Sequence, residues 1–327
     1  MQTEPHPKST GQRPATWKIL AAFAAIYVIW GSTYLAIRYG VETFPPFLMA
    51  GSRFVVAGVL LYGFARMRGA GKPTVRQWRD AAVAGGLMLM IGNGGVTWAE
   101  QVIPSGVAAL LVALVPVWMA LVDWARPRGS RPDWQVITGL AIGFVGVALL
   151  ARNNGHGAGA AYTWGVVALM ASSICWAVGS VFNKHAQRPE SPLLGIGMQM
   201  CAGGAMLLLV AALRNEYATF TWAALSAKSV GAWIYLTTAG SLIGFPAYIW
   251  LLQVTTPARV ATYAYVNPFV AVLLGCTFGN EPFSRAMFLA GALIITAVAL
   301  IVCSGSGFPP HCWKRLWRGR IAASQQP

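Results

Sequence analysis

Apolar stretches of about 20 residues recur along the whole chain, and short polar segments that contain Pro and Gly separate them. A helix of about 20 apolar residues matches the thickness of the hydrocarbon core of a bilayer. The pattern therefore predicts an all-α membrane protein with ten transmembrane helices. The expected spans are residues 18–38, 46–66, 79–99, 104–124, 133–151, 162–184, 192–213, 229–252, 258–279 and 284–304.

A sequence repeat divides the chain into two related halves. The pattern W-x2-Q-V-x6-A-x6-P begins at Trp98 and occurs again 152 positions later, at Trp250. Further pairs repeat at an offset of 146, namely Trp30 with Trp176 and Arg38 with Lys184. Each half holds five expected spans, and an odd number reverses the orientation of the second half. We therefore expect two inverted five-helix repeats around a central cavity, which is typical of membrane transporters.

The spans and the repeat predict four segments. Residues 1–17 form a disordered cytoplasmic tail, 18–151 the first repeat, 162–304 the second repeat, and 305–327 a basic cytoplasmic tail. In the last segment Trp313 and Trp317 stand among basic residues. This favours either a short anchor on the inner leaflet or a solvated basic tail.

Composition and charge agree with a membrane location. Hydrophobic residues make up 56% of the chain and charged residues 10%, against about 25% charged residues in soluble domains. The formal net charge of +15 could indicate a nucleic-acid partner, but no polar domain accompanies it. With both termini in the cytoplasm, 18 of the 24 Lys and Arg residues lie in cytoplasmic segments and 5 in outer segments. We therefore expect a multi-pass membrane protein with both termini in the cytoplasm, with lipid and no nucleic acid as a partner.

The residue types that carry catalysis or bind metals are poorly placed for either role. All nine carboxylates and all four histidines lie in tails, loops or span ends. A proton relay through the membrane is therefore not supported, although Glu100 or Glu281 could serve from an outer vestibule. The five cysteines lack paired spacing, and no nucleophile stands beside a base. We expect no disulfide framework, no metal or other cofactor, and no enzyme activity.

Arg53 is the one Lys or Arg residue that lies away from the ends of an expected span, roughly 10 Å below the outer surface. A charge at that depth costs about 2.5–3.5 kcal/mol, so the guanidinium should face a cavity or a partner. It is interpreted either as an anchor for a substrate carboxylate or phosphate, or as half of a structural ion pair with Glu42 or Glu100. The offset of 146 maps Arg53 to Gln199, so the site is polar in both halves but charged in one.

Helix breakers in corresponding spans of two repeats point to a transport site. Asn93 lies among glycines in the third span, and Gly244 with Pro246 occupies the corresponding place in the eighth. Asn267 precedes Pro268 in the ninth span. There it could line the cavity or bond the backbone carbonyl groups that a proline frees.

Aromatic and hydroxyl side chains cluster in the first span, and the repeat adds Trp176 to them. Tyr263 and Tyr265 point about 200° apart on a helix, so at most one of them faces the cavity well. The predicted substrate-binding residues are Trp30, Ser32, Tyr34, Arg53, Asn93, Trp176, Gln199, Tyr263, Tyr265 and Asn267.

Several of these residues resemble the EamA family of the drug/metabolite transporter superfamily, and within it the YedA-type inner-membrane transporters of bacteria. The resemblance covers residues 18–304 and rests on the runs Trp30 to Tyr34, Arg53-Phe54, Gly92-Asn93-Gly94 and Tyr263 to Pro268. It implies a central cavity lined by the first four spans of each repeat, with the fifth spans peripheral, and export of amino acids, other metabolites or drugs. Glu281-Pro282 follows the family pattern, whereas the aligned residue of the first half is Ser130.

We therefore expect a secondary transporter that exports a small organic metabolite, amino acid-like or amphipathic, by alternating access. Multidrug-type efflux of neutral or cationic amphipaths is the alternative, and a membrane-embedded enzyme is disfavoured. Gly139, Gly143 and Gly146 could pack within one chain or against a second copy, so a monomer and a homodimer both stay open.

Overall fold

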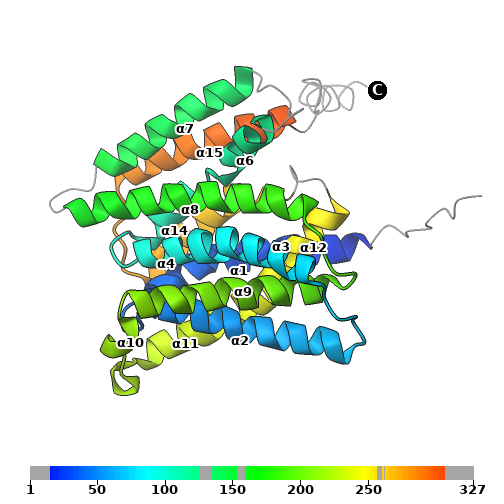
Figure 1. Ribbon diagram of the computed structural model, residues 1–327. Helices are drawn as coiled ribbons and strands as arrows, with labels where there is room; N and C mark the ends of the chain where they lie inside the picture. Colours follow the sequence, from blue (N-terminus) through cyan, green and yellow to red (C-terminus); the bar gives the residue numbers. More distant parts are fainter. Residues whose placement is uncertain (1–14, 126–133, 153–158, 256–259, 261, 306–327) are drawn as a thin grey trace, which may run out of the picture.

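The computed structural model describes residues 15–125, 134–152, 159–255, 260 and 262–305, and these residues form helices and no β-strand. The helices run roughly along one direction and make a single bundle (Figure 1). The tails at 1–17 and 305–327 and the predicted inner-leaflet anchor lie almost wholly outside the described residues.

The helices follow the expected spans. In the first half they are α1 (Thr16–Gly40), α2 (Pro46–Met67), α3 (Val75–Gly85), η1 (Gly86–Asn93), α4 (Gly94–Ala99), α5 (Ser105–Val112), α6 (Val115–Trp124) and α7 (Trp134–Arg152). In the second half they are α8 (Ala160–His185), α9 (Pro192–Leu213), α10 (Glu216–Thr219), η2 (Trp222–Ala224), α11 (Ala227–Tyr235), η3 (Leu236–Gly244), α12 (Phe245–Val254), α14 (Tyr263–Phe278) and α15 (Arg285–Gly305).

Six helical stretches are long and apolar enough to cross a membrane. They are residues Thr16–Gly40, Pro46–Met67, Val75–Ala99, Ala160–His185, Pro192–Leu213 and Ala227–Val254. Four shorter apolar helices coincide with the remaining expected spans, at Ser105–Met119, Ile137–Leu149, Val266–Phe278 and Arg285–Leu300. The protein is therefore an all-helical, multi-pass membrane protein.

The third and fourth expected spans show how the structure differs in detail from the expectation. The third helix begins at Val75, four residues before the predicted start, because Thr74 and Gln77 form a capping box. The fourth span is not one helix, since α5 ends at Val112 and α6 begins at Val115, next to Pro116. A proline has no backbone N–H to continue the helical hydrogen bonds, which accounts for the interruption.

The two halves contact each other through equivalent surfaces of α2 and α9. A Cβ atom on Gly58 would lie 2.9 Å from the carbonyl oxygen of Gly197, and one on Gly204 would lie 3.0 Å from that of Gly51. The offset of 146 converts the first contact into the second, because it maps Gly58 to Gly204 and Gly51 to Gly197. Such reciprocal contacts are the mark of a two-fold relation. The glycines are required here because the two backbones approach too closely for a side chain.

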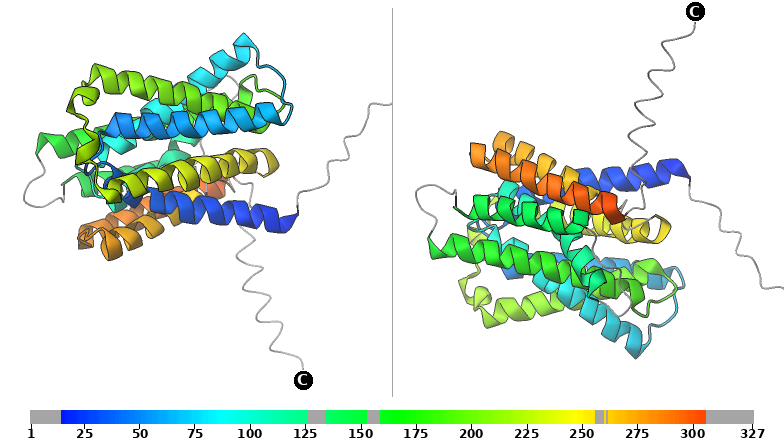
Figure 2. Two further views of the ribbon diagram at one scale, coloured as in Figure 1. Left: turned by 90° about the horizontal axis from the view of Figure 1, so that it is seen from below. Right: turned by 90° about the horizontal axis from the view of Figure 1, so that it is seen from above.

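The fifth helix of each half lies at one edge of the bundle, where α7 and α15 run side by side (Figures 1 and 2). Gly143 and Gly146 face this contact, and a Cβ atom on Gly146 would lie 2.8 Å from the side chain of Ile294. These two glycines of the predicted small-residue face therefore pack within the chain.

A buried carboxylate from the second half caps a helix of the first. Glu216 in α10 accepts hydrogen bonds from the backbone N–H of Phe47, at 3.4 Å, and of Leu48, at 2.8 Å. Both groups lie in the first turn of α2, where backbone N–H groups lack partners and favour negative charge. Burial raises the pKa of the Glu216 carboxyl above its ordinary value, although the two hydrogen bonds oppose the shift.

This shift predicts how stability depends on pH. A carboxyl with a raised pKa keeps its proton longer in the folded protein, so stability falls as pH rises from the unfolded toward the folded value. We expect the free energy of unfolding of the wild type, relative to Glu216→Gln, to decrease above pH 4.5. The slope is at most about 1.4 kcal/mol per pH unit because one proton is involved. Denaturant unfolding in detergent at several pH values measures it, and a difference that increases with pH contradicts the assignment.

Candidate functional site

A cavity of about 770 Å³, its open mouth included, lies between the helices of the two repeats. Its walls come from α1, α2, η1, α4, α5, α6, α8, η3, α12 and α14. Among the described residues, none from α7, α9 or α15 lines it. The fifth helix of each repeat is thus peripheral, as the resemblance implies, but α9 packs against α2 instead of lining the cavity.

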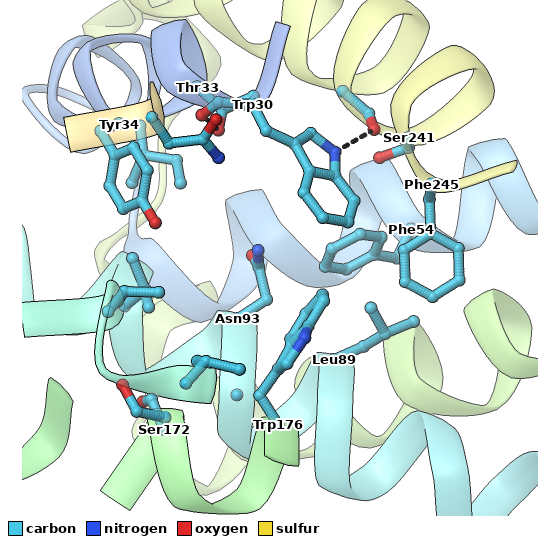
Figure 3. Close-up of a pocket in the computed structure, with 18 of the residues that line it drawn as sticks. Trp30, Thr33, Tyr34, Phe54, Leu89, Asn93, Ser172, Trp176, Ser241 and Phe245 are labelled. Carbon is cyan, nitrogen blue, oxygen red and sulfur yellow. Dashed lines mark hydrogen bonds between the residues drawn. The ribbon is translucent and has the colours of Figure 1, made fainter. Parts of the chain in front are cut away.

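Most of the predicted site residues meet in this cavity. Seven of them line it, namely Trp30, Tyr34, Arg53, Asn93, Trp176, Tyr263 and Asn267. Figure 3 shows the side chains of Trp30, Asn93 and Trp176 pointing toward one another across the space. Side chains more than 200 residues apart in sequence therefore share one site.

Two predicted residues lie elsewhere. Ser32 faces α11, where its hydroxyl group lies 2.6 Å from that of Tyr235. Gln199 lines a second, smaller cavity and donates a hydrogen bond to Asn183 at 3.0 Å. Tyr265 lies on α14, but its side chain is outside the described part of the structure.

Aromatic rings form the wall around the equivalent tryptophans of the two repeats. The Trp30 and Trp176 rings meet edge to face, with centroids 5.8 Å apart. Trp30 also contacts Tyr263, at 5.5 Å, and Tyr248, at 5.0 Å. The Trp30 ring nitrogen donates a long hydrogen bond of 3.4 Å to the carbonyl oxygen of Gly240 (Figure 3). Two tryptophans at equivalent positions of the sequence repeat therefore meet at the cavity.

Arg53 is held by a neutral partner. Its side chain is 2% exposed, and its Nη2 atom donates a hydrogen bond to Oδ1 of Asn93. Its guanidinium lies 4.5 Å from the ring centroid of Phe54, and its Nε atom has no hydrogen-bond partner. The cation is therefore buried with unused hydrogen-bonding capacity.

One expected alternative, a structural ion pair between Arg53 and Glu42, is wrong. The Glu42 carboxylate pairs with Lys228 at 2.7 Å, at an exposed position. Glu100 is near enough to attract the charge of Arg53, but neither a hydrogen bond nor an ion pair joins these two described side chains.

Asn267 connects two helices at the cavity wall. With its amide nitrogen turned toward α1, Asn267 can donate hydrogen bonds to the carbonyl oxygens of Ile26, Tyr27 and Tyr263, each 3.2 Å away. The carbonyl oxygens of Ile26 and Tyr27 belong to α1, so the side chain joins α14 to α1. Asn267 lines the cavity. The carbonyl group that Pro268 leaves without a helical N–H is that of Ala264, which is not among the partners of Asn267, so these contacts do not support the alternative role in backbone repair.

The matched helix breakers take the form of π-helical segments. The segment η1 ends at Asn93 and η3 ends at Gly244, in corresponding spans of the two halves. Both segments contribute to the cavity wall, through Leu89, Gly92 and Asn93 on one side and Gly240 and Ser241 on the other. A π-helical turn holds one extra residue, and such turns are frequent at functional sites.

Several wall residues were not predicted, including Phe54, Ser172, Ser173, Ser241 and Phe245. The two serines of α8 could have been found, because they precede Trp176 by three and four positions and share its helix face. No group of three His, Cys, Asp or Glu side chains that could hold a metal occurs in the described parts of the chain.

The sequence model of a known protein family matches both halves of the chain, at residues 16–152 and 163–303. The chain belongs to the EamA-like transporter family. It is 39% identical to the inner membrane transporter YedA of Escherichia coli (strain K12), over 89% of this chain and 92% of YedA.

Other EamA relatives carry more specific names. A protein of Streptantibioticus cattleyicolor named "Probable terminal-alkyne amino-acid exporter" is 28% identical, over 87% of this chain and 93% of its own. A protein of Salmonella typhimurium named "Probable amino-acid metabolite efflux pump" is 27% identical, over 83% of this chain and 90% of its own. A solved crystal structure has a TM-score of 0.59 at 23% identity, over 87% of this chain and 96% of that one, and this likeness concerns the fold alone.

Family membership assigns this EamA protein to the membrane transporters and not to the enzymes. It also confirms the family that the sequence runs resemble. The aromatic and polar cavity between the repeats is accordingly the candidate site for a small-molecule substrate.

Proposed function

We propose that this EamA transporter exports a small organic metabolite with a carboxylate or similar anionic group by alternating access. The observation that carries the proposal is the state of Arg53, which is buried in the cavity wall beside a neutral amide and has an unpartnered Nε atom. A guanidinium forks onto a carboxylate or phosphate, and such charge-assisted hydrogen bonds are the strong ones. An anionic ligand would therefore supply the counter-charge that the described site lacks.

The cavity walls narrow the substrate class further. The rings of Trp30, Phe54, Trp176 and Phe245 offer apolar surface beside the cation. An amino acid-like or amphipathic compound combines an anionic group with an apolar part, and fits both features. The names of the Streptantibioticus and Salmonella relatives support the same class.

The proposal includes ten spans in two inverted repeats, at 18–151 and 162–304. The six long and four shorter apolar helices support the count, and the reciprocal contact of α2 with α9 supports the inversion. Among the described residues, eight Lys and Arg residues lie at the end of the bundle where α1 begins and five at the other end (Figure 1). The eight are Lys18, Arg66, Arg68, Lys72, Arg76, Arg79, Lys184 and Arg188, and the five are Arg38, Arg152, Arg214, Lys228 and Arg285. This bias supports a cytoplasmic location of that end in the bacterial inner membrane. We propose a monomer, because Gly143 and Gly146 already pack against α15.

Efflux of neutral or cationic amphipaths is the second candidate. The observation that favours it is the aromatic wall, since the faces of Trp30 and Trp176 attract cations as well as apolar groups. In that case Arg53 would serve to position Asn93 and would not contact the substrate.

Thermal unfolding of the purified protein in detergent separates the two candidates. A panel of amino acids, organic acids, neutral amphipaths and quaternary ammonium compounds is tested against the wild type, Arg53→Gln and Arg68→Gln. A ligand at about 100 times its Kd stabilises the folded protein by roughly 2.7 kcal/mol. We expect anionic or zwitterionic compounds to stabilise the wild type and Arg68→Gln, whose exposed arginine directly follows the same helix, but not Arg53→Gln. Stabilisation by neutral or cationic compounds alone would overturn the anion proposal in favour of the second candidate.

A further inference from the structure

Glu100 is a buried carboxyl that the transport site described above does not use. It follows directly after α4, beyond the cavity wall formed by Asn93 and Val96, and its side chain is 0% exposed. Neither carboxyl oxygen has a hydrogen-bond partner. Its backbone carbonyl oxygen, in contrast, accepts a hydrogen bond of 2.5 Å from Nη1 of Arg38.

The charged groups around Glu100 are engaged with other atoms. Arg38 also donates to the carbonyl oxygen of Gln101 at 2.9 Å, and Arg53 donates to Asn93. The Glu281 carboxylate accepts hydrogen bonds from the backbone N–H of Ser105, at 2.7 Å, and of Gly106, at 3.2 Å. Arg38, Arg53 and Glu281 act on Glu100 through their charges, and Tyr34 of α1 also lies within range of it. None of these four side chains forms a hydrogen bond with the Glu100 carboxyl group.

This geometry favours the neutral acid. An ionised carboxylate without hydrogen-bond donors in a protein interior is costly, and a group in that position takes up a proton instead. The negative charge of Glu281 adds to this preference, whereas Arg38 and Arg53 oppose it. The two guanidinium groups could stabilise the carboxylate fully only if their donors turned toward it and water entered.

We propose that Glu100 binds a proton in the conformation seen here. It releases the proton to water when the bundle opens at the end where α4 terminates. In the release step the O–H bond of the acid breaks, water accepts the proton, and Arg38 and Arg53 stabilise the carboxylate that remains. By linkage, acid favours the conformation seen here, in which Glu100 is buried, and alkali favours the open one. The opening step rests on the proposed alternating-access function, but the presence of the proton does not.

The first experiment detects the proton. Infrared spectra of the full-length protein in lipid nanodiscs at neutral pH are recorded in H2O and D2O for the wild type, Glu100→Gln and Glu42→Gln. Glu42 is the matched control, because it is an exposed glutamate paired with Lys228. We expect the carbonyl band of a buried protonated acid in the wild type and in Glu42→Gln, and its loss in Glu100→Gln. A spectrum that Glu100→Gln leaves unchanged in this band overturns the proposal.

The second experiment tests the link to opening. Val96→Cys, in a background without the five native cysteines, places a thiol on the cavity wall one turn before Glu100. Its rate of labelling by a polar maleimide is measured from acid to alkaline pH, with Glu100 intact and with Glu100→Gln. The rate with Glu100 intact is divided by the rate with Glu100→Gln, which removes the effect of thiol ionisation because both proteins carry the same thiol. We expect the ratio to rise with pH by up to about tenfold per unit, as one released proton requires. A ratio independent of pH, with the infrared band present, contradicts the link but leaves the proposed transport function standing.

Discussion

Replacing Gly58 with valine is expected to destabilise the folded protein by about 3 kcal/mol, because overpacking at a backbone contact leaves no side chain free to move. A Cβ atom at this position would lie 2.6 Å from the backbone nitrogen of Cys201 and 2.9 Å from the carbonyl oxygen of Gly197. Both atoms belong to the backbone of α9, so relief requires the two helices to separate. Thermal unfolding and elution volume of the purified variant in detergent measure the effect.

Two further glycines make this prediction specific. Gly63 lies on the same helix, and a Cβ atom added to it would have nothing within 4 Å, so Gly63→Val should change stability by less than about 0.5 kcal/mol. Gly204 is the equivalent of Gly58 in the second half, where an added Cβ atom would meet the backbone nitrogen of Val55 at 2.8 Å. Gly204→Val should therefore destabilise as much as Gly58→Val. A mild effect at both Gly58 and Gly204 contradicts the reciprocal contact between α2 and α9.

The helices could largely be predicted from the sequence, and so could seven of the residues that line the cavity, since these depend on features that single residues carry. A run of about 20 apolar residues has few alternatives to a membrane helix. An isolated charge such as Arg53 must face polar groups wherever the helices pack. Trp30 and Trp176 follow from the repeat, because equivalent residues near a two-fold axis come together.

Two features could not be predicted in the same way, namely which neighbouring helix a side chain faces and where a helix becomes π-helical. The offset of 146 maps Arg53 to Gln199. Under the proposed inversion, however, the equivalent of a residue near one end of the bundle lies near the opposite end. Gln199 accordingly lines a separate cavity with Asn183. The extra residue per turn in η1 and η3 leaves no mark on apolar periodicity within an almost wholly apolar span. Ser32 faces α11 because a partner, Tyr235, lies there, and a distant hydroxyl group cannot be inferred from α1 alone.

Changing Asn93 to aspartate is expected to weaken anion binding about 100-fold while preserving the fold. The wild-type amide accepts a hydrogen bond from Arg53 and is neutral, so the charge of Arg53 stays available to a ligand. The substitution Asn93→Asp would place a carboxylate at the same position, and a buried, hydrogen-bonded pair with Arg53 would form. Affinity for an anionic substrate should fall about 100-fold, which corresponds to about 2.7 kcal/mol. Isothermal titration with the compound that stabilises the wild type measures this loss.

The comparison of Asn93→Asp with Arg53→Gln separates a ligand contact from a structural role. Both variants should lose anion binding, but their stabilities without ligand should differ in sign. Arg53→Gln removes the buried cation and leaves Asn93 with a weaker partner, whereas Asn93→Asp gives that cation a counter-charge and should equal or exceed the wild type in stability. Unchanged affinity in Asn93→Asp would mean that the substrate never meets Arg53. The aromatic wall around Trp30 and Trp176 would then provide the main binding energy, and neutral or cationic amphipaths would be its natural ligands.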